Sequence, residues 1–166
     1  VLHRVPANVR GDGTHTIAEL VAMKNLDPLR GIGYRTPLER IQLGEVERMF
    51  LDSQAISVDD VPEDGEIVYL RENSNISTGG DSIDVTDEMP ERYKHIAVRA
   101  AQAVGAVFCG VDMMIRDRNR EQSEDEAYTI IELNFNPAIH IHCYPYQGQH
   151  RKADEKLLEL LFPNCS

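Results

Sequence analysis

The sequence lacks tryptophan, has few cysteines and carries far fewer basic than acidic residues. Lysine and arginine number 17 against 28 aspartates and glutamates, so the net charge at neutral pH is −11. A nucleic-acid-binding surface needs clustered positive charge, and we therefore expect no nucleic-acid partner. No apolar run approaches the ~20 residues that a membrane helix requires, so we expect no membrane partner either.

The three cysteines, Cys109, Cys143 and Cys165, are an odd number and follow no regular spacing. Such a set is typical of reduced thiols and not of a disulfide framework, which predicts a cytoplasmic protein. With 166 residues, 42% of them hydrophobic, the chain is long enough for one domain with its own core. It opens at Val1 inside an apparent strand, so we predict that it is a fragment of a longer chain.

The stretch of residues 130–137 sets a carboxylate and an amide at the end of an apolar run. Because side chains alternate along a strand, Glu132 and Asn134 should share one face, while Ile131 and Leu133 point into a core. Oxygen ligands fixed on one face suit Mg²⁺, which usually binds together with substrate phosphates.

A second apolar run, residues 107–115, contains one carboxylate, Asp112. An ionised carboxylate in an apolar strand is costly unless a partner or a metal compensates it. Residues 116–125 are mostly charged and read as a hairpin loop, which would bring Asp112 beside Glu132. The alternative is that Asp112 sits in water at a strand edge and that Glu132 and Asn134 form a turn.

The rest of the chain predicts an α+β fold, with an antiparallel sheet flanked by helices. Thr16 and Glu19 form a capping-box pattern at the start of a helix. A second helix, at about residues 44–51, should present Val46, Met49 and Phe50. Further elements are expected as strands at residues 1–5, 66–72, 106–115 and 127–134 and as helices at residues 91–104 and 153–161.

Several motifs resemble those of a known family. Gly110–Asp112, a hairpin and then Glu132–Pro137 resemble the metal-binding end of the ATP-grasp ligases, which join a carboxylate to an amine through an acylphosphate. Residues 4–17 and 70–87 resemble the branch that holds cyanophycin synthetase and bifunctional glutamate–cysteine ligase/glutathione synthetase. Residues 134–146 resemble the bifunctional enzyme in particular.

The resemblance implies that residues 1–166 are the C-terminal portion of an ATP-grasp domain and fold as its C-terminal lobe. The implied reaction ligates γ-glutamylcysteine to glycine with ATP, within a larger bifunctional chain whose upstream lobe is a partner of this one. Two Mg²⁺ ions, with Mn²⁺ as the alternative ion, would be held by Asp112, Glu132 and Asn134. Positioning and electrostatics can carry such phosphoryl transfer without a nucleophilic side chain.

Arg71 ends a predicted strand and precedes a loop rich in asparagine, hydroxyl residues and glycine. Glycines permit close approach of the backbone to a ligand, and the polar groups can hold phosphate oxygens. The resemblance implies that Arg71 steadies the transferred phosphoryl group and that Asn75 lies near the phosphates. The alternative is that Arg71 pairs with Glu72 or Asp81 on the surface.

Met114 should share a face with Asp112, and its polarizable thioether suits an adenine ring; the alternative is a core methionine. His140 and His142 would share a face on a strand, which allows a zinc site, although Cys143 would point to the other face. A packed or hydrogen-bonded histidine pair and contact with a peptide substrate are the other interpretations. The resemblance places His142, Tyr144 and Tyr146 near the acceptor site.

Two other functions remain open at this point. One is a cyanophycin-type ligase that adds amino acids to a peptide carboxylate. The other is a non-catalytic acidic domain that binds divalent ions or a partner. An ATP-grasp fold holds its nucleotide between two lobes, and the lysines of the earlier lobe would lie upstream of Val1. We therefore expect residues 1–166 alone to be inactive in ATP turnover.

Overall fold

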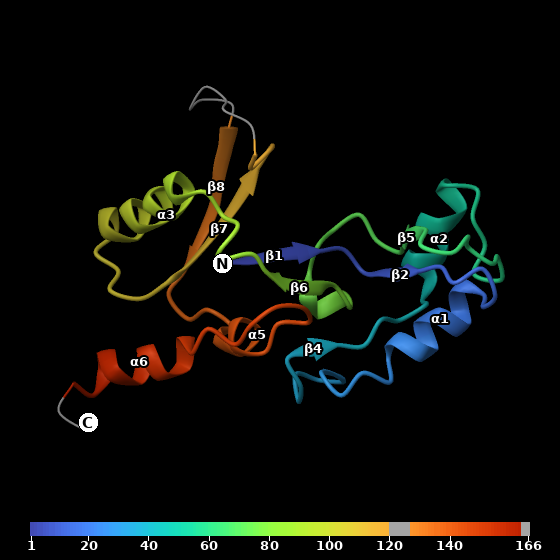
Figure 1. The fold of residues 1–166 in the computed structure, drawn as a ribbon, viewed down its shortest axis with the longest axis horizontal. Helices are drawn as coiled ribbons and strands as arrows, with labels where there is room; N and C mark the ends of the chain where they lie inside the picture. The colour runs from blue at the N-terminus through green and yellow to red at the C-terminus, as the bar shows by residue number, and fades with distance from the viewer. Residues whose placement is uncertain (120–126, 164–166) are drawn as a thin grey trace. The chain divides into compact units, whose positions relative to one another are not determined.

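The structure is a computed structural model that describes residues 1–119 and 127–163. It forms two compact units, whose elements are drawn in Figure 1. The core unit comprises residues 2–84 and 140–151, and the hairpin unit comprises residue 1, residues 85–139 and residues 152–166. No glycine-rich or proline-rich linker lies where the chain passes from one unit to the other, so this division was not predictable from the sequence.

The core unit is built on short ladders of two strands each. β1 (Leu2–Val5) pairs antiparallel with β6 (Asp81–Asp84), and β2 (Asn8–Arg10) pairs antiparallel with β5 (Ile67–Tyr69). The third ladder is parallel and joins β3 (Arg30–Gly31) to β4 (Leu38–Glu39). One antiparallel sheet was expected, but the described residues of the two units form separate two-stranded ladders, three of them antiparallel and one parallel.

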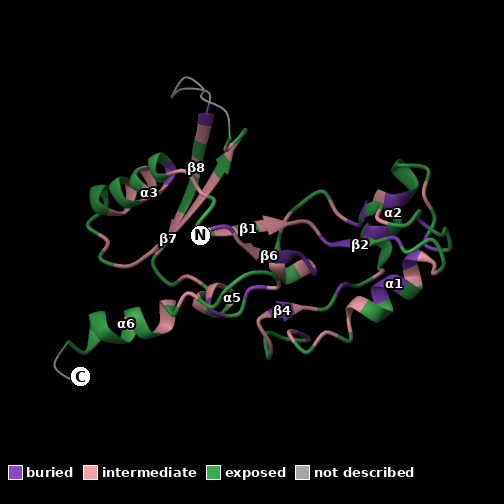
Figure 2. Ribbon diagram, viewed as in Figure 1, coloured by how far each residue is buried: buried purple, intermediate pink, exposed green. Residues whose placement is uncertain are grey.

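Helix α1 (Ile17–Lys24) confirms the capping-box prediction. The Thr16 hydroxyl accepts the Glu19 backbone N–H at 3.3 Å, and the Glu19 carboxylate accepts the Thr16 N–H at 2.8 Å. These bonds satisfy donors that a helix start leaves unpaired. One side of α1 is buried, as Figure 2 shows, in a core made of Ala7, Val9, Ile17, Leu20, Val21, Ile41, Leu51, Val58, Val68 and Leu70.

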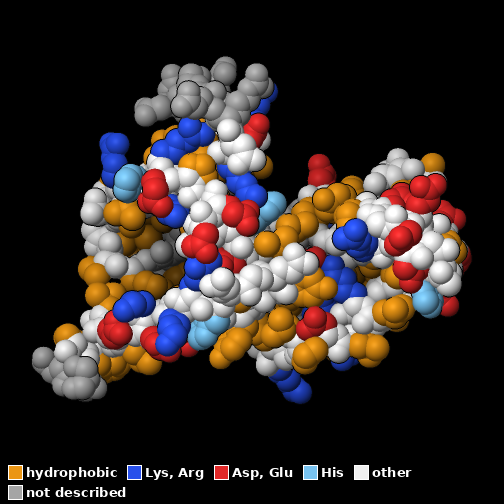
Figure 3. All heavy atoms as spheres, in the orientation of Figure 1, with side chains coloured by type: hydrophobic (Ala, Val, Ile, Leu, Met, Phe, Trp, Pro, Cys, Tyr) orange, Lys and Arg blue, Asp and Glu red, His pale blue; other side chains and the backbone are white. Residues whose placement is uncertain are grey.

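Helix α2 (Glu45–Ser53) lies where a helix was predicted but buries a different face. Of the three apolar residues that the helix was expected to present, Val46 and Met49 are 55% and 64% exposed and Phe50 is half-buried, whereas Leu51 and the carboxylate residue Glu47 are buried. The pattern of apolar residues did not predict the buried face of α2, because Glu47 is buried in an ion pair with Arg71. In Figure 3 acidic side chains gather over the part of the core unit that carries α2.

The hairpin unit contains α3 (Glu91–Ala103), β7 (Gly110–Ile115), β8 (Tyr128–Asn134) and α6 (Ala153–Leu161). All four confirm predicted elements, with strands shorter than expected at their first residues. Strands β7 and β8 pair antiparallel. The predicted loop at residues 116–125 lies mostly outside the described residues, which end at 119 on that side.

Helix α3 lies against the hairpin through one buried aromatic residue. Tyr93 is buried, and its ring meets that of Tyr128 on β8 edge to face, with centroids 6.2 Å apart. Such a geometry is favoured by the ring quadrupoles. The helix ends before Gly105, which has a φ of +70° and so suits a left-handed C-terminal position. Among the described helices, none is both long and apolar enough to cross a membrane.

The turn before α1 generates a prediction about pH. The His15 ring nitrogen Nδ1 lies 2.7 Å from the Asp12 carboxylate. That hydrogen bond raises the pKa of His15 above its usual 6.5. The pKa of Asp12 falls from 3.8 to about 2, chiefly because its carboxylate accepts the His15 backbone N–H. The stability that His15 contributes is therefore present below pH 6.5 and is lost as the pH rises through its folded-state pKa.

We expect Asp12→Asn to lower the His15 pKa toward 6.5, measured by NMR titration of the imidazole protons. Asp52→Asn serves as the control, because the bonds of Asp52 at the end of α2, as far as the structure describes the chain, go to its backbone carbonyl and not to its side chain. An unchanged His15 titration in Asp12→Asn would contradict the proposed cause.

Candidate functional site

The hairpin of β7 and β8 brings the predicted metal ligands together. Asp112 stands directly opposite Glu132, and Gly110 stands opposite Asn134. The Asn134 amide donates to the Glu132 carboxylate at 2.9 Å. The expectation that a hairpin closes between the two runs and places Asp112 beside Glu132 is therefore confirmed, whereas metal binding stays a prediction.

A β-bulge follows this pair. The register slips after Asp112, so that Met113 pairs with Ile130 and Ile131 has no partner of its own. An extra residue in one strand breaks the strict alternation of faces. Ile131 is accordingly 56% exposed, and the expectation that it points into a core is wrong.

The surface around the pair is open and rich in oxygen. Glu132 is exposed, and Asp112 and Asn134 are half-buried, so Asp112 is less deeply enclosed than its apolar strand suggested. Two carboxylates and an amide are the oxygen ligands that Mg²⁺ or Mn²⁺ prefers. Met114 is 67% exposed and is not the core residue that its alternative interpretation required.

Arg71, in the core unit, has a partner that the sequence did not indicate. Its Nε lies 2.5 Å from a carboxylate oxygen of Glu47 on α2, and neither Glu72 nor Asp81 takes the role. The Glu47 side chain is only 3% exposed and that of Arg71 is 20% exposed. The alternative of a surface pair with Glu72 or Asp81 is therefore wrong, because the partner comes from a helix 24 residues away.

The loop after Arg71 is shaped by contacts within the protein. It contains the short helix η1 (Ile76–Thr78), and Gly79 closes that helix at φ +91°. A Cβ on Gly79 would stand 2.8 Å from Ile41, and one on Gly80 would stand 2.7 Å from the Val5 carbonyl oxygen. The two glycines are thus required for packing, which corrects the interpretation that they admit a ligand to the backbone.

The exposed side chains of the loop remain available to a ligand. Asn75 and Ser77 are exposed, whereas the backbone N–H groups of Thr78, Gly79 and Gly80 all donate to carbonyls of the loop itself. Any phosphate contact here would consequently use side chains and not a cradle of these three amide groups.

A buried charge cluster, which we call the Asp81 cluster, was missed at the sequence level. Asp81 is bound by Lys24 at 2.7 Å, by the Asn8 amide at 2.9 Å and, through a very short contact, by Arg30. The Arg30 guanidinium, fully buried, also donates to the Gly79 carbonyl at 3.1 Å. The cluster therefore ties β6 and the end of the loop to α1 and β3. No local motif signals it, because its members are spread along the chain.

Tyr146 covers the Asp81 cluster and does not stand apart from it. Its ring centre lies 5.1 Å from the Lys24 ammonium and 5.2 Å from the Arg30 guanidinium, within reach of cation–π attraction. Burial raises the pKa of Tyr146, and burial also lowers the pKa of Lys24. Tyr146, expected near the acceptor, thus has a defined packing role.

The histidine segment is a short helix and not the strand or irregular segment that was expected. α5 (Ile139–Cys143) carries His140 and His142, and residues two apart on a helix are separated by about 200°, so they do not share a face. Among the described residues these two histidines belong to no group of three metal-binding side chains. The zinc interpretation of the pair is therefore not supported.

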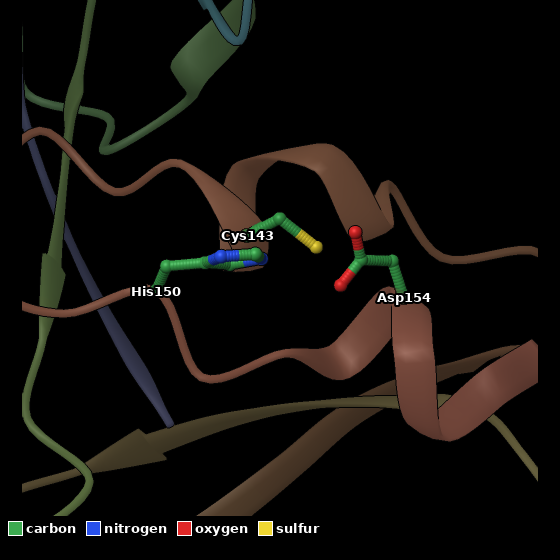
Figure 4. A group of neighbouring side chains, drawn as sticks. All are labelled: Cys143, His150 and Asp154. Carbon is green, nitrogen blue, oxygen red and sulfur yellow. The ribbon is translucent and has the colours of Figure 1, made fainter.

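Another imidazole lies beside the cysteine instead. Ligand atoms of Cys143 and His150 come within 4.8 Å, and the His150 ring stacks on Tyr144 with centroids 5.3 Å apart. Figure 4 draws these two residues together with Asp154. Because Asp154 belongs to the hairpin unit and the other two to the core unit, we infer no metal site from them.

Comparison with known proteins shows close relatives of one kind. The chain is 61% identical over 162 residues to the glutathione biosynthesis bifunctional protein GshAB of Clostridium perfringens. It is 60% identical over 161 residues to the protein of the same name from Desulfotalea psychrophila. These alignments cover 98% and 97% of the chain but 21% and 20% of the relatives, so the chain spans about a fifth of their length. No family model matches.

A solved structure agrees with the sequence comparison. The crystal structure of a bifunctional glutathione synthetase from Pasteurella multocida superposes with a TM-score of 0.88 at 51% identity. It matches 98% of this chain, which corresponds to 22% of that protein's chain. The α+β fold and the resemblance to the glutathione synthetase part of the bifunctional enzymes are thus confirmed.

The Asp81 cluster generates a prediction about stability. Asp81→Asn would remove the carboxylate that forms ion pairs with both Lys24 and Arg30. Loss of one partner of a buried ion pair typically costs about 3–5 kcal/mol. We expect a loss of that size in urea unfolding followed by circular dichroism. Asp59→Asn is the control: Asp59 is exposed, and its variant should differ by less than about 0.5 kcal/mol. Equal midpoints would contradict a structural role for the cluster.

Proposed function

We propose that this chain is the C-terminal portion of the ATP-grasp domain of a bifunctional, cytoplasmic, glutathione-forming protein. In this proposal it serves the ATP- and Mg²⁺-dependent ligation of γ-glutamylcysteine to glycine through an acylphosphate. The observation that carries it is the 61% identity over 98% of the chain to a glutathione biosynthesis bifunctional protein. The paired carboxylates of Asp112 and Glu132 on the hairpin support it, because such a reaction needs oxygen ligands for Mg²⁺.

In the hairpin unit, Asp112, Glu132 and Asn134 would hold the metal. Bound Mg²⁺ would neutralise charge on the β- and γ-phosphates as the phosphoryl group moves to the substrate carboxylate. The contribution of the chain is to fix the ligands: strand pairing sets Asp112 opposite Glu132, and the Asn134 amide orients the Glu132 carboxylate. The ligands thus lie on paired strands, which position side chains more precisely than a loop does.

Met114 offers an apolar surface for the adenine ring. It lies two residues beyond Asp112 on β7 and is largely exposed, as is Ile131 at the bulge. Exposed apolar side chains beside a carboxylate pair are what a nucleotide requires, since its base is apolar and its phosphates are charged. We therefore assign Met114 to the base.

In the core unit, Arg71 and Asn75 would act on the phosphoryl group. The Nε of Arg71 is occupied by Glu47, while neither Nη nitrogen has a partner within the described residues. A guanidinium held at one nitrogen can present the others to phosphate oxygens. Asn75 is exposed on the following loop and could donate its amide to the same kind of group.

The acceptor side of the reaction is assigned to His142, Tyr144 and Tyr146. All three lie in the segment of residues 140–151 that returns to the core unit by a bridge between Ile83 and Gln147. Tyr144 has the most exposed side chain of the three, whereas Tyr146 is engaged by the Asp81 cluster. Tyr144 is therefore the strongest candidate for direct contact with a substrate.

The metal assignment is tested in the longer bifunctional protein. Asp112→Asn or Glu132→Gln should abolish the glycine ligation, by at least about 100-fold, because the phosphoryl charge would lose its metal. The formation of γ-glutamylcysteine should persist. Both products are quantified by chromatography, with Mn²⁺ affinity measured in parallel.

Asp117→Asn is the matched control, since Asp117 lies just after β7 and its carboxylate accepts, among the described residues, a local turn N–H from Asn119 alone. Retention of glutathione formation by both metal-ligand variants would rule out this metal site. Ligation of arginine to an aspartate primer, in place of glycine to γ-glutamylcysteine, would instead identify a cyanophycin-type ligase.

The isolated chain of residues 1–166 should not turn over ATP, because we propose that an upstream lobe supplies the rest of the nucleotide site. Phosphate release with γ-glutamylcysteine and glycine present should stay at the background rate, whereas a version extended upstream by one lobe should be active. Glutathione synthesis by the chain alone would refute this, and divalent-ion binding without activity in either version would indicate a non-catalytic domain.

A further inference from the structure

Glu47 is an unusual residue in the core unit. Its side chain is almost fully buried, yet it is a carboxylate on the first turn of a helix whose neighbours Val46 and Met49 are exposed. An ionised carboxylate is removed from water only at a cost that its partners must offset. The burial of Glu47 in preference to two apolar residues thus needs a specific reason.

Both oxygens of Glu47 are occupied. One accepts the backbone N–H of Gly44 at 3.0 Å, and the other accepts the Nε–H of Arg71 at 2.5 Å. The first bond closes the start of α2, in the way that Glu19 closes the start of α1. The second is a charge-assisted bond to a residue outside the helix.

The manner in which Glu47 binds Arg71 is informative. Arginine and carboxylate groups often meet as a two-pronged pair through the terminal nitrogens. Here Glu47 takes only Nε, and within the described residues both Nη nitrogens are left without partners. The Arg71 side chain is also 20% exposed, and Arg71 stands just before the loop that carries Asn75. The guanidinium is thus fixed at Nε by Glu47, while its two Nη nitrogens can still bind a ligand.

We propose that Glu47 is a positioning residue for Arg71 in the ligation of glycine. By fixing Nε, Glu47 sets the plane of the guanidinium and directs both Nη groups toward the transferred phosphoryl group. Because Glu47 is anchored at the rigid start of α2, the orientation is present before substrate binds, and little entropy is lost on binding. This inference rests on the proposed function of Arg71, and the experiment below separates the two.

The test is a double-mutant cycle in the longer bifunctional protein, with kcat and KM of the glycine ligation measured for each variant. Arg71→Met should lower kcat by on the order of 10³-fold, as loss of an arginine at a phosphoryl group does. Glu47→Gln should lower kcat by about 10- to 100-fold and change the KM for ATP by less than about twofold, because the arginine stays but is misaligned. In the Arg71→Met background, Glu47→Gln should have almost no further effect.

Glu19→Gln is the matched control, because Glu19 occupies the same third helical position and the same capping role in α1 and pairs with no arginine among the described residues. It should leave kcat unchanged. Glu47→Asp keeps the charge beside Arg71 but is too short to reach both partners. It should show the same loss in kcat, and it replaces Glu47→Gln if that variant does not fold, as judged by its melting temperature.

The outcomes divide clearly. An unchanged kcat in Arg71→Met would overturn the role of Arg71 and the positioning inference with it. A reduced kcat in Arg71→Met, with full kcat in a folded Glu47→Gln or Glu47→Asp, would overturn the positioning inference alone. Equal losses from Glu47→Gln in both backgrounds would show that Glu47 acts through stability and not through Arg71.

Discussion

The carboxylate of Asp81 is the interaction on which the core unit depends. It receives Lys24 from α1, Arg30 from β3 and Asn8 from β2, so that one buried anion holds three separate elements to β6. The separate two-stranded ladders leave this unit without one continuous sheet, so a shared polar centre takes over part of that role. Two cations around one carboxylate are tolerable inside only because carbonyl oxygens and the Tyr146 ring share the remaining positive charge.

Buried and exposed charges have different tasks in this protein. Two of the buried carboxylates, Asp81 and Glu47, each accept hydrogen bonds from at least two partners and fix loops and side chains in place. The pair of Asp112 and Glu132 is held by strand pairing, with Glu132 exposed and Asp112 half-buried. A carboxylate that must bind a metal has to remain accessible, whereas a carboxylate that positions another group is most effective when it cannot move.

The elements that could be predicted from the sequence are those formed by residues close together in the chain. The α1 capping box, α3 with its C-terminal glycine and the hairpin that sets Asp112 against Glu132 all follow from neighbouring residues. The bulge at Ile131 was not predictable, because it depends on the register between two strands. The helical form of α5 was missed for a related reason: a segment of five residues has too few periods to distinguish helix from strand.

Glu19 and Glu47 occupy equivalent positions in their helices but differ in their tertiary contacts. Both are carboxylates at the third position of a helix, and both accept the backbone N–H three residues earlier. One lies in solvent and only caps its helix; the other is buried and also holds Arg71. The difference arises from the residue that the fold brings to the second oxygen, which lies 24 positions away for Glu47. A motif therefore predicts the bond that a carboxylate makes within its own helix, while its contribution to chemistry is decided by tertiary structure.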